Sequence, residues 1–397
     1  MKNFAKIWIL FSLCLSLAAC SSTPTATEQA PTLPETNPFK EQTATPPGLT
    51  TRSTATATAP AADKELTHLL TENNLLLQYG EPRIHLVDDD KLLVWFDSAA
   101  LFDLSSDTLL YKTEVTTGPS DLKVDFAENV VGVLKKDGNC KDMDCAVVLD
   151  RYDSKLNLID SLDLSQILDI RPDLLRPIQC ALSQSGDKLV CAKNETGQVL
   201  LYDLQTKDPK VAFDFSKSSL SSFRGINSIA FAGNDSYLAF TAADSSGSGF
   251  GIIDLDNNQV VDYMKWESIG GDIQTTDHAV FFHEEFKGSW VPSTGKIFKI
   301  DLETLEKQEI QLADKEESQY VTVSPTGQYI VTVRNTAEPG ADYTAGSIKV
   351  YDGQTMELIR QIDLERGFPR LVIDEANRSL IVYYSVGGNM KLVRYDF

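Results

Sequence analysis

Hydrophobic and polar positions along most of the chain follow a pattern that predicts short β-strands. From about residue 75 onward, apolar runs are separated by clusters of Gly, Asp, Asn and Ser, which is typical of strands joined by turns. Helical periodicity is confined to one short stretch, Asp63–Glu72. We therefore expect an all-β body.

Two pieces of sequence recur within this body. One is a turn followed by a strongly apolar strand, found at Ser183–Cys191, Ala232–Phe240 and Ser324–Thr332. The other is an apolar strand that ends in Asp and leads into a turn, found at Leu200–Thr206, Ile252–Asn257, Phe298–Thr304 and Val350–Thr355, with weaker copies around Phe102 and Tyr152. A repeat of about 40–50 residues with four strands predicts a β-propeller.

These repeats resemble those of WD40-like and YVTN-type propellers over residues 75–397. The resemblance is specific for architecture and weak for function, since the WD dipeptide and the CxxCH haem motif are absent. Counting the repeats gives seven blades, the last with only three strands between Phe368 and Phe397. We predict that the spare strand Asn74–Tyr79 supplies the fourth strand and closes the ring. An eight-bladed or open arrangement is the alternative.

The N-terminus has the order of a secretory signal. Lys2 and Lys6 precede an apolar stretch that ends at Leu17-Ala18-Ala19-Cys20, and this stretch is too short to span a bilayer. The segment resembles the lipobox of bacterial lipoproteins. That resemblance implies cleavage of residues 1–19 and a diacylglyceryl group on Cys20, which anchors the protein firmly in a membrane. An ordinary secretory signal with a chance cysteine is the alternative.

Residues 20–62 change character, because they are rich in Thr, Pro and Ala and carry almost no large apolar side chains. Such a segment stays disordered, so we expect a linker followed by one propeller domain over residues 63–397. Ser21 is not the aspartate that retains lipoproteins in an inner membrane. The predicted location is therefore the extracytoplasmic face of the cell membrane, or the outer membrane in a cell with two membranes.

Charge and cysteine content limit the chemistry. The net charge of −21 argues against nucleic acid and against direct binding of anionic lipid head groups. Four cysteines in an exported body predict disulfides, and we pair Cys140 with Cys145 and Cys180 with Cys191. The second pair flanks a turn that would bring its members side by side. A metal site is not expected, because the CxxC spacing is absent.

Catalytic signals are weak. His278 and His283 are five residues apart on one predicted strand and point to opposite faces, and His85 is interpreted as structural. No catalytic residue and no cofactor are therefore predicted. The loop over Asp137–Asp144 gathers oxygen ligands that calcium prefers, without a known calcium spacing, so solvated turn acids are the alternative.

Two sets of residues are candidates for binding. Long links between the second and third strands are predicted in blades two, four, five and six, at Lys135–Cys145, Ala243–Gly249, His283–Gly295 and Arg334–Gly346. Their aromatic and arginine side chains suit a binding surface: Phe286, Trp290, Arg334 and Tyr343. Arginines also recur where the chain reaches an innermost strand, near the mouth of the central channel, and would suit a carboxylate or phosphate: Arg83, Arg176, Arg224 and Arg370.

The predicted function is that of a non-catalytic, monomeric binding module for a protein or glycan, held at a membrane by the lipid on Cys20. Two alternatives remain open at this point. One is a hydrolytic, lactonase-like enzyme, which rests on fold analogy alone. The other is a scaffold for assembly of the cell envelope.

Overall fold

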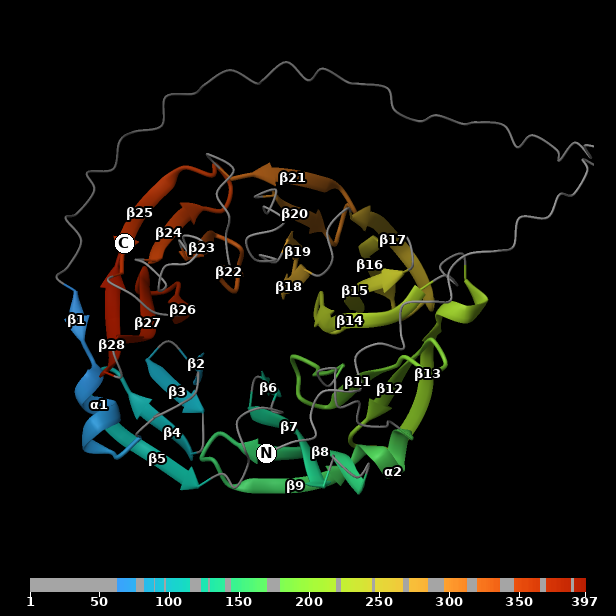
Figure 1. Ribbon diagram of the computed structural model, residues 1–397, viewed down its shortest axis with the longest axis horizontal. Helices are drawn as coiled ribbons and strands as arrows, with labels where there is room; N and C mark the ends of the chain where they lie inside the picture. Colours follow the sequence, from blue (N-terminus) through green and yellow to red (C-terminus); the bar gives the residue numbers. More distant parts are fainter. Residues whose placement is uncertain are drawn as a thin grey trace, which may run out of the picture. The chain divides into compact units, whose positions relative to one another are not determined.

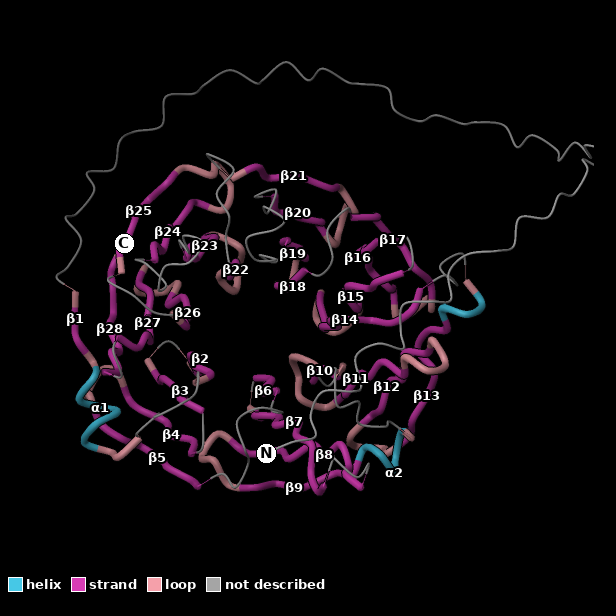
Figure 2. The backbone as a smooth tube through the Cα atoms, viewed as in Figure 1, coloured by secondary structure: helices cyan, strands magenta, loops and turns pink. Residues whose placement is uncertain are grey.

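Seven four-stranded antiparallel sheets surround a central axis in the computed structural model (Figures 1 and 2). The all-β, seven-bladed propeller predicted from the repeats is thereby confirmed. The structure describes residues 63–75, 82–88, 90–95, 98–114, 123–127, 129–139, 144–169, 179–218, 223–244, 247–266, 271–284, 296–312, 320–335, 346–364, 369–386 and 389–397. The N-terminal residues that carry the predicted signal, Cys20 and the linker lie outside these ranges.

Each of the first six blades uses four consecutive strands, innermost first. Blades one to three are β2 (Arg83–Val87), β3 (Lys91–Trp95), β4 (Ser98–Asp103), β5 (Thr108–Glu114); β6 (Lys123–Phe126), β7 (Val130–Asn139), β8 (Asp144–Asp153), β9 (Leu158–Asp163); and β10 (Cys180–Leu182), β11 (Lys188–Lys193), β12 (Gln198–Asp203), β13 (Asp208–Asp214). Two short helices lie on the links that follow blades two and three: α2 (Leu164–Leu168) and the 3-10 helix Phe215–Lys217.

The remaining blades follow the same plan except the last. Blades four to six are β14 (Phe223–Ala232), β15 (Tyr237–Asp244), β16 (Gly247–Asp254), β17 (Gln259–Trp266); β18 (Gly271–Thr275), β19 (Ala279–Glu284), β20 (Lys296–Asp301), β21 (Lys307–Gln311); and β22 (Tyr320–Val323), β23 (Tyr329–Asn335), β24 (Gly346–Asp352), β25 (Leu358–Asp363). Blade seven contains β26 (Arg370–Asp374), β27 (Ser379–Val386), β28 (Asn389–Asp396) and the N-terminal β1 (Lys64–Glu65).

The core is divided among the interfaces between neighbouring blades. Apolar clusters join blades one and two, two and three, and so on around to blades seven and one. The second strand of a blade is buried almost throughout, as in β3, where four of five residues are buried. Both faces of each sheet therefore contribute to the core, which explains the continuous apolar runs of the inner strands.

Chain direction divides the molecule into two faces. Because the strands of a blade alternate in direction, the turns after the first and third strands lie on one side, which we call the turn face. The links between the second and third strands, and the links from one blade to the next, lie on the opposite side, which we call the loop face. Every innermost strand thus begins on the loop face.

The turns after the third strands share one design. An aspartate ends the third strand in all seven blades, and in the first six its Oδ1 atom accepts hydrogen bonds from the backbone N–H groups that follow it in the turn. In the turn of blade three, Asp203 accepts from Gln205 at 2.9 Å and from Thr206 at 2.8 Å. Lys207 is the last residue of this turn and has a φ of 58°, in the left-handed region.

An N-terminal strand closes the ring, as predicted, but the strand named from the sequence was wrong. β1 pairs antiparallel with β28, with Lys64 opposite Arg394 and Glu65 opposite Val393. Asn74 instead lies in a turn after helix α1 (Thr67–Glu72), and residues 76–79 lie outside the described ranges. The leucines of α1 and its flanks pack into the interface of blades seven and one, so apolar character here marks a buried helix rather than a strand.

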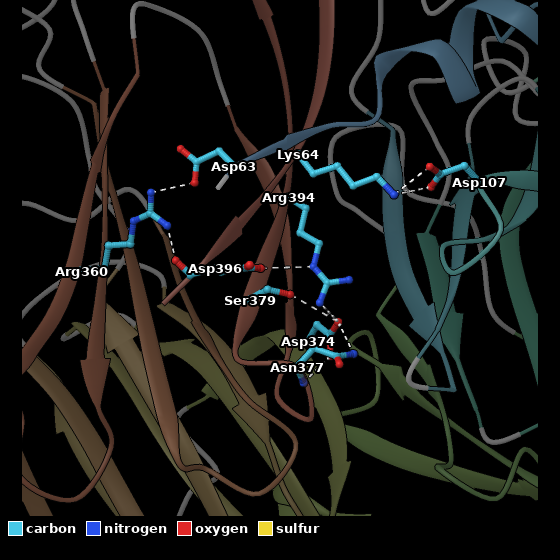
Figure 3. A network of polar contacts seen from close by, with 9 residues as sticks. All are labelled: Asp63, Lys64, Asp107, Arg360, Asp374, Asn377, Ser379, Arg394 and Asp396. Atoms are coloured by element: carbon cyan, nitrogen blue, oxygen red, sulfur yellow. Dashed lines mark hydrogen bonds and ion pairs between the residues drawn. The ribbon is translucent and has the colours of Figure 1, made fainter. Parts of the chain in front are cut away.

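Charged groups tie the closing strand to both neighbouring blades (Figure 3). On one side, the guanidinium of Arg360 lies 2.8 Å from the Asp63 carboxylate and donates to the backbone oxygen of Asp396. On the other side, the ammonium of Lys64 lies 2.7 Å from the carboxylate of Asp107 in blade one. Blades six, seven and one are therefore connected through β1.

The predicted disulfide between Cys180 and Cys191 is confirmed, with an S–S distance of 2.02 Å. The two residues face each other across β10 and β11, and both side chains are buried. The second predicted bridge is not tested, because Cys140 lies outside the described residues and only the backbone of Cys145 is described, opposite Gly138.

Candidate binding face

The loop face contains the ends of both long links that carry the predicted aromatic and arginine residues. One link joins Glu284 to Lys296, and the other joins Asn335 to Gly346. Phe286, Trp290 and Tyr343 lie within these links and outside the described residues. Arg334 is placed by its backbone in β23, next to the end of that strand. Their role in binding stays a prediction.

Two of the four predicted long links are wrong. In blade two the strands continue to Asn139 and restart at Asp144, and in blade four they continue to Asp244 and restart at Gly247. The polar and glycine-rich segments that suggested loops are instead paired, for example Ala243 with Ser248. Backbone hydrogen bonds extend a hairpin even where its side chains bury little apolar surface.

The arginines predicted near the inner strands take equivalent positions in the fold. Arg83 and Arg370 are the first residues of β2 and β26, and Arg224 is the second residue of β14. Arg176 lies outside the described residues. Sequence analysis missed Lys123, which begins β6 and completes the series of cations. The clue to Lys123 was its place at the start of the short innermost strand of blade two.

The environments of these cations differ. Arg83 is exposed and makes no ion pair within the part of the chain that the structure describes. Arg370 is partly buried, and this burial lowers the pKa of its guanidinium. Lys123 donates to the backbone oxygen of Cys180 and lies 3.4 Å from the Asp125 carboxylate, so its charge is engaged between blades two and three.

The histidines near the axis are structural groups. His85 stacks on Phe126 with ring centroids 4.1 Å apart, and burial lowers its pKa to about 4, so it is neutral at physiological pH. His283 is buried, and its Nε2 atom accepts a hydrogen bond from the backbone N–H of Val321 at 3.3 Å. Both histidines therefore join neighbouring blades.

Carboxylates at the turn face serve the fold in the same way. Asp235 of blade four is buried and accepts from the backbone N–H of Gln184 and the hydroxyl of Ser185 in blade three, each at 2.8 Å. Glu375 of blade seven accepts from the backbone N–H of Thr326 in blade six at 3.1 Å. These acids fix the turns of adjacent blades to each other.

The described residues contain no group of three or more His, Cys, Asp or Glu side chains arranged to hold a metal ion. The helices within those ranges are all too short or too polar to cross a membrane.

Comparison with known proteins identifies the fold and leaves the family open. No protein-family model and no curated protein match the sequence. The β-propeller domain of Myceliophteria thermophila Cps50 (Swd1) superposes with a TM-score of 0.56 at 11% identity, covering 80% of this chain and 98% of that one. Hydrazine synthase of Kuenenia stuttgartiensis superposes with a TM-score of 0.52 at 12% identity, covering 79% and 94%.

At these identities the likeness concerns the fold alone. The class that the fold defines is the seven-bladed β-propeller, in which a rigid ring presents loops around an axis. Such a domain is consistent with a binding or scaffold module.

Proposed function

We propose that this protein is a lipid-anchored, extracytoplasmic binding module whose loop face recognises a protein or glycan. The observation that carries the proposal is the different use of polar side chains on the two faces. Turn-face carboxylates hold backbone groups and neighbouring turns, whereas the loop face gathers the long links of blades five and six and the cations that begin inner strands. Binding residues are commonly found on loops that a rigid scaffold positions.

The place where the linker joins the propeller supports this orientation. β28 runs toward the turn face and ends at Asp396, so the antiparallel β1 begins at the turn face with Asp63 beside it. A chain attached through Cys20 is thus connected to the face opposite the candidate binding surface.

The anchor is tested by metabolic labelling with a fatty acid that carries an alkyne. The Cys20→Ser variant should lose both the label and its place in the membrane fraction. Cys14→Ser is the matched control, because Cys14 lies within the segment that would be removed. Retained labelling of Cys20→Ser would contradict lipidation at this residue.

The binding face is tested by a photo-crosslinking amino acid placed at position 290 in cells, followed by mass spectrometry. We expect a dominant protein or glycan adduct from this position. Position 256 is the control, because Asp256 is an exposed residue of the turn face. Equal adducts from both positions, or none from position 290, would contradict the proposal. Adducts with several envelope proteins at once would favour the scaffold function.

A further inference from the structure

The N-terminal part of the propeller, residues 63–75, is joined to the ring by a short length of backbone pairing. We call it the closing segment. β1 contributes two paired residues to blade seven, whereas β27 and β28 are paired over eight. One further hydrogen bond, from the N–H of Leu66 to the oxygen of Leu392 at 2.7 Å, continues the pairing before α1 begins. The backbone thus holds β1 over a much shorter length than the strands beside it.

Apolar side chains provide most of the remaining contact. The leucines of the closing segment are buried in the cluster between blades seven and one: Leu66, Leu69, Leu70 and Leu75. Contacts of this kind act over short distances, so they are lost together once the segment moves away. α1 has six residues, which is too short for a helix that is stable away from the ring. The closing segment should therefore dock and detach as one unit.

The charges on β1 are balanced by acids from two blades (Figure 3). Lys64 lies directly opposite Arg394, and like charges in this arrangement destabilise a strand pair. The ammonium of Lys64 is offset by the Asp107 carboxylate of blade one at 2.7 Å, and Arg394 by the Asp374 carboxylate of blade seven at 3.4 Å. Pairing of β1 thus depends on an acid from each side of the seam that it closes.

The direction of β1 determines how a pull on the chain would act. β1 is antiparallel to β28 and begins at the turn face, so a pull between the preceding chain and the loop face acts along the strand. The first contact that resists it is the ion pair between Asp63 and Arg360 of blade six at 2.8 Å. The contacts of Lys64 and of the leucines follow in chain order.

We propose that the closing segment is a releasable attachment, which tension detaches as a unit before the blades unfold. The ion pairs of Asp63 and Lys64 help to set the force at which this happens. The inference rests on the proposed function, which supplies an anchor at one end and a partner on the loop face at the other. Detachment lengthens the connection under tension, while the apolar clusters of the other six blade interfaces keep the loop face folded.

Single-molecule pulling of the full chain in detergent tests the proposal, with handles at positions 58 and 195. Glu195 is an exposed residue of the loop face in blade three, so its handle takes the place of a partner. We expect an early step of up to roughly 65 Å as the chain from Asp63 to Pro82 extends. Handles at positions 195 and 256 bypass β1 and should give no early step. A single unfolding event from position 58 would overturn the proposal.

A pair of variants tests the role of the charges. Asp107→Asn should make the early step roughly two- to fivefold faster at a fixed force, because Lys64 then faces Arg394 without its acid. The turn should keep its shape, since Asn258 of blade four takes the equivalent position with the same φ of 52°. Glu65→Gln is the matched control, because Glu65 is exposed and makes no ion pair with any described residue. Equal acceleration in both variants would overturn the role of the ion pairs.

A bridge across β1 and β28 tests which contact opens. Glu65 and Val393 lie opposite each other, so Glu65→Cys combined with Val393→Cys should form a disulfide. This disulfide should abolish the early step until a reducing agent is added. An early step that persists in the oxidised variant would show that the step does not come from β1, which would overturn the proposal.

The two proposals can fail separately. An early step in a protein that gives no adduct from position 290 would support the releasable attachment and contradict recognition through the long links. An adduct from position 290 in a protein that unfolds in a single event would overturn the releasable attachment and leave the proposed function standing.

Discussion

On the turn face, carboxylates accept hydrogen bonds from the backbone of their own turn or of the next blade, whereas on the loop face Arg83 begins an inner strand and makes no ion pair with the described residues. Asp203 and Asp235 show the first arrangement and Arg83 the second. Both faces are polar, so composition alone does not separate them. The difference teaches that the hydrogen-bond partners of a charged group, rather than its charge, indicate whether the group serves the fold or a ligand.

The largest expected effect comes from acidifying the protein, because it acts together on the six third-strand aspartates that accept backbone hydrogen bonds in their turns. The hydroxyl of Ser105 and the neighbouring backbone N–H groups lower the pKa of Asp103 to about 2, and similar hydrogen bonds lower the pKa of its five counterparts. A carboxylate with a lowered folded-state pKa stabilises the fold above its unfolded value of 3.8, and this contribution is lost as the pH falls toward about 2.

Urea unfolding between neutral pH and about pH 3 measures this loss, with a midpoint that should fall as the acids protonate. The Asp203→Asn variant keeps an acceptor and removes one titrating group, so its midpoint should be less sensitive to acid. A midpoint that does not change over this range would show that the turns do not depend on charge.

The disulfide gives the next largest effect, and it acts at the loop-face end of blade three. Cys180→Ala combined with Cys191→Ala should lower the free energy of unfolding by about 3 kcal/mol, because the bridge constrains the unfolded chain. Denaturation with and without a reducing agent is the measurement. The reducing agent should destabilise the parent protein, and an equal response of the double variant would contradict this assignment.

The hydrogen bonds of Asp235 between blades three and four are expected to contribute less to the free energy of unfolding. Asp235→Ala leaves the N–H of Gln184 and the hydroxyl of Ser185 without their buried acceptor, which should cost about 2 kcal/mol of unfolding free energy. Asp256→Ala, an exposed residue of a neighbouring turn, should change it by less than about 0.5 kcal/mol. Photo-crosslinking from position 290 on the loop face should be unaffected by either variant, which separates the two faces directly.

The smallest effect concerns backbone strain in a turn-face loop. Lys207 is exposed and has a φ of 58°, so Lys207→Gly should raise the free energy of unfolding by up to about 1 kcal/mol. Lys210→Gly in the adjoining strand β13 should lower it by about 0.5–1 kcal/mol, because glycine is unfavourable within a strand. Thermal melting compares the pair, and a loss of stability in both variants would show that the turn is not strained.

Much of the fold could be predicted from the repeats, because the blades share the same residue types in their turns. Strands that end in Asp predicted the six turns and hence the blade count, and the turn Ser183–Gly186 predicted the bridge between Cys180 and Cys191. These features depend on neighbours in sequence, so a local pattern is sufficient to find them.

Features that depend on distant partners were harder to predict. β1 has only two residues, both exposed, and its role follows from β28 at the other end of the chain rather than from its own composition. The apolar run near Leu75 was the stronger local signal and was misleading. Of the candidate site, the positions of Arg83, Arg224 and Arg370 could be predicted, whereas the engagement of Lys123 with Cys180 required the structure.

Closure by β1 also makes completion of the ring depend on the C-terminal strand β28. The hydroxyl oxygen of Thr67 accepts a hydrogen bond from the backbone N–H of Leu392, which lies 325 residues later in the sequence. Strand β1 therefore remains unpaired until β28 has been synthesised. The entropic cost of such a long loop grows only slowly with its length, but the search for a distant partner slows folding. A chain that ends early would leave the leucines of α1 uncovered, and proteases and chaperones would encounter that apolar surface before any mature ring existed.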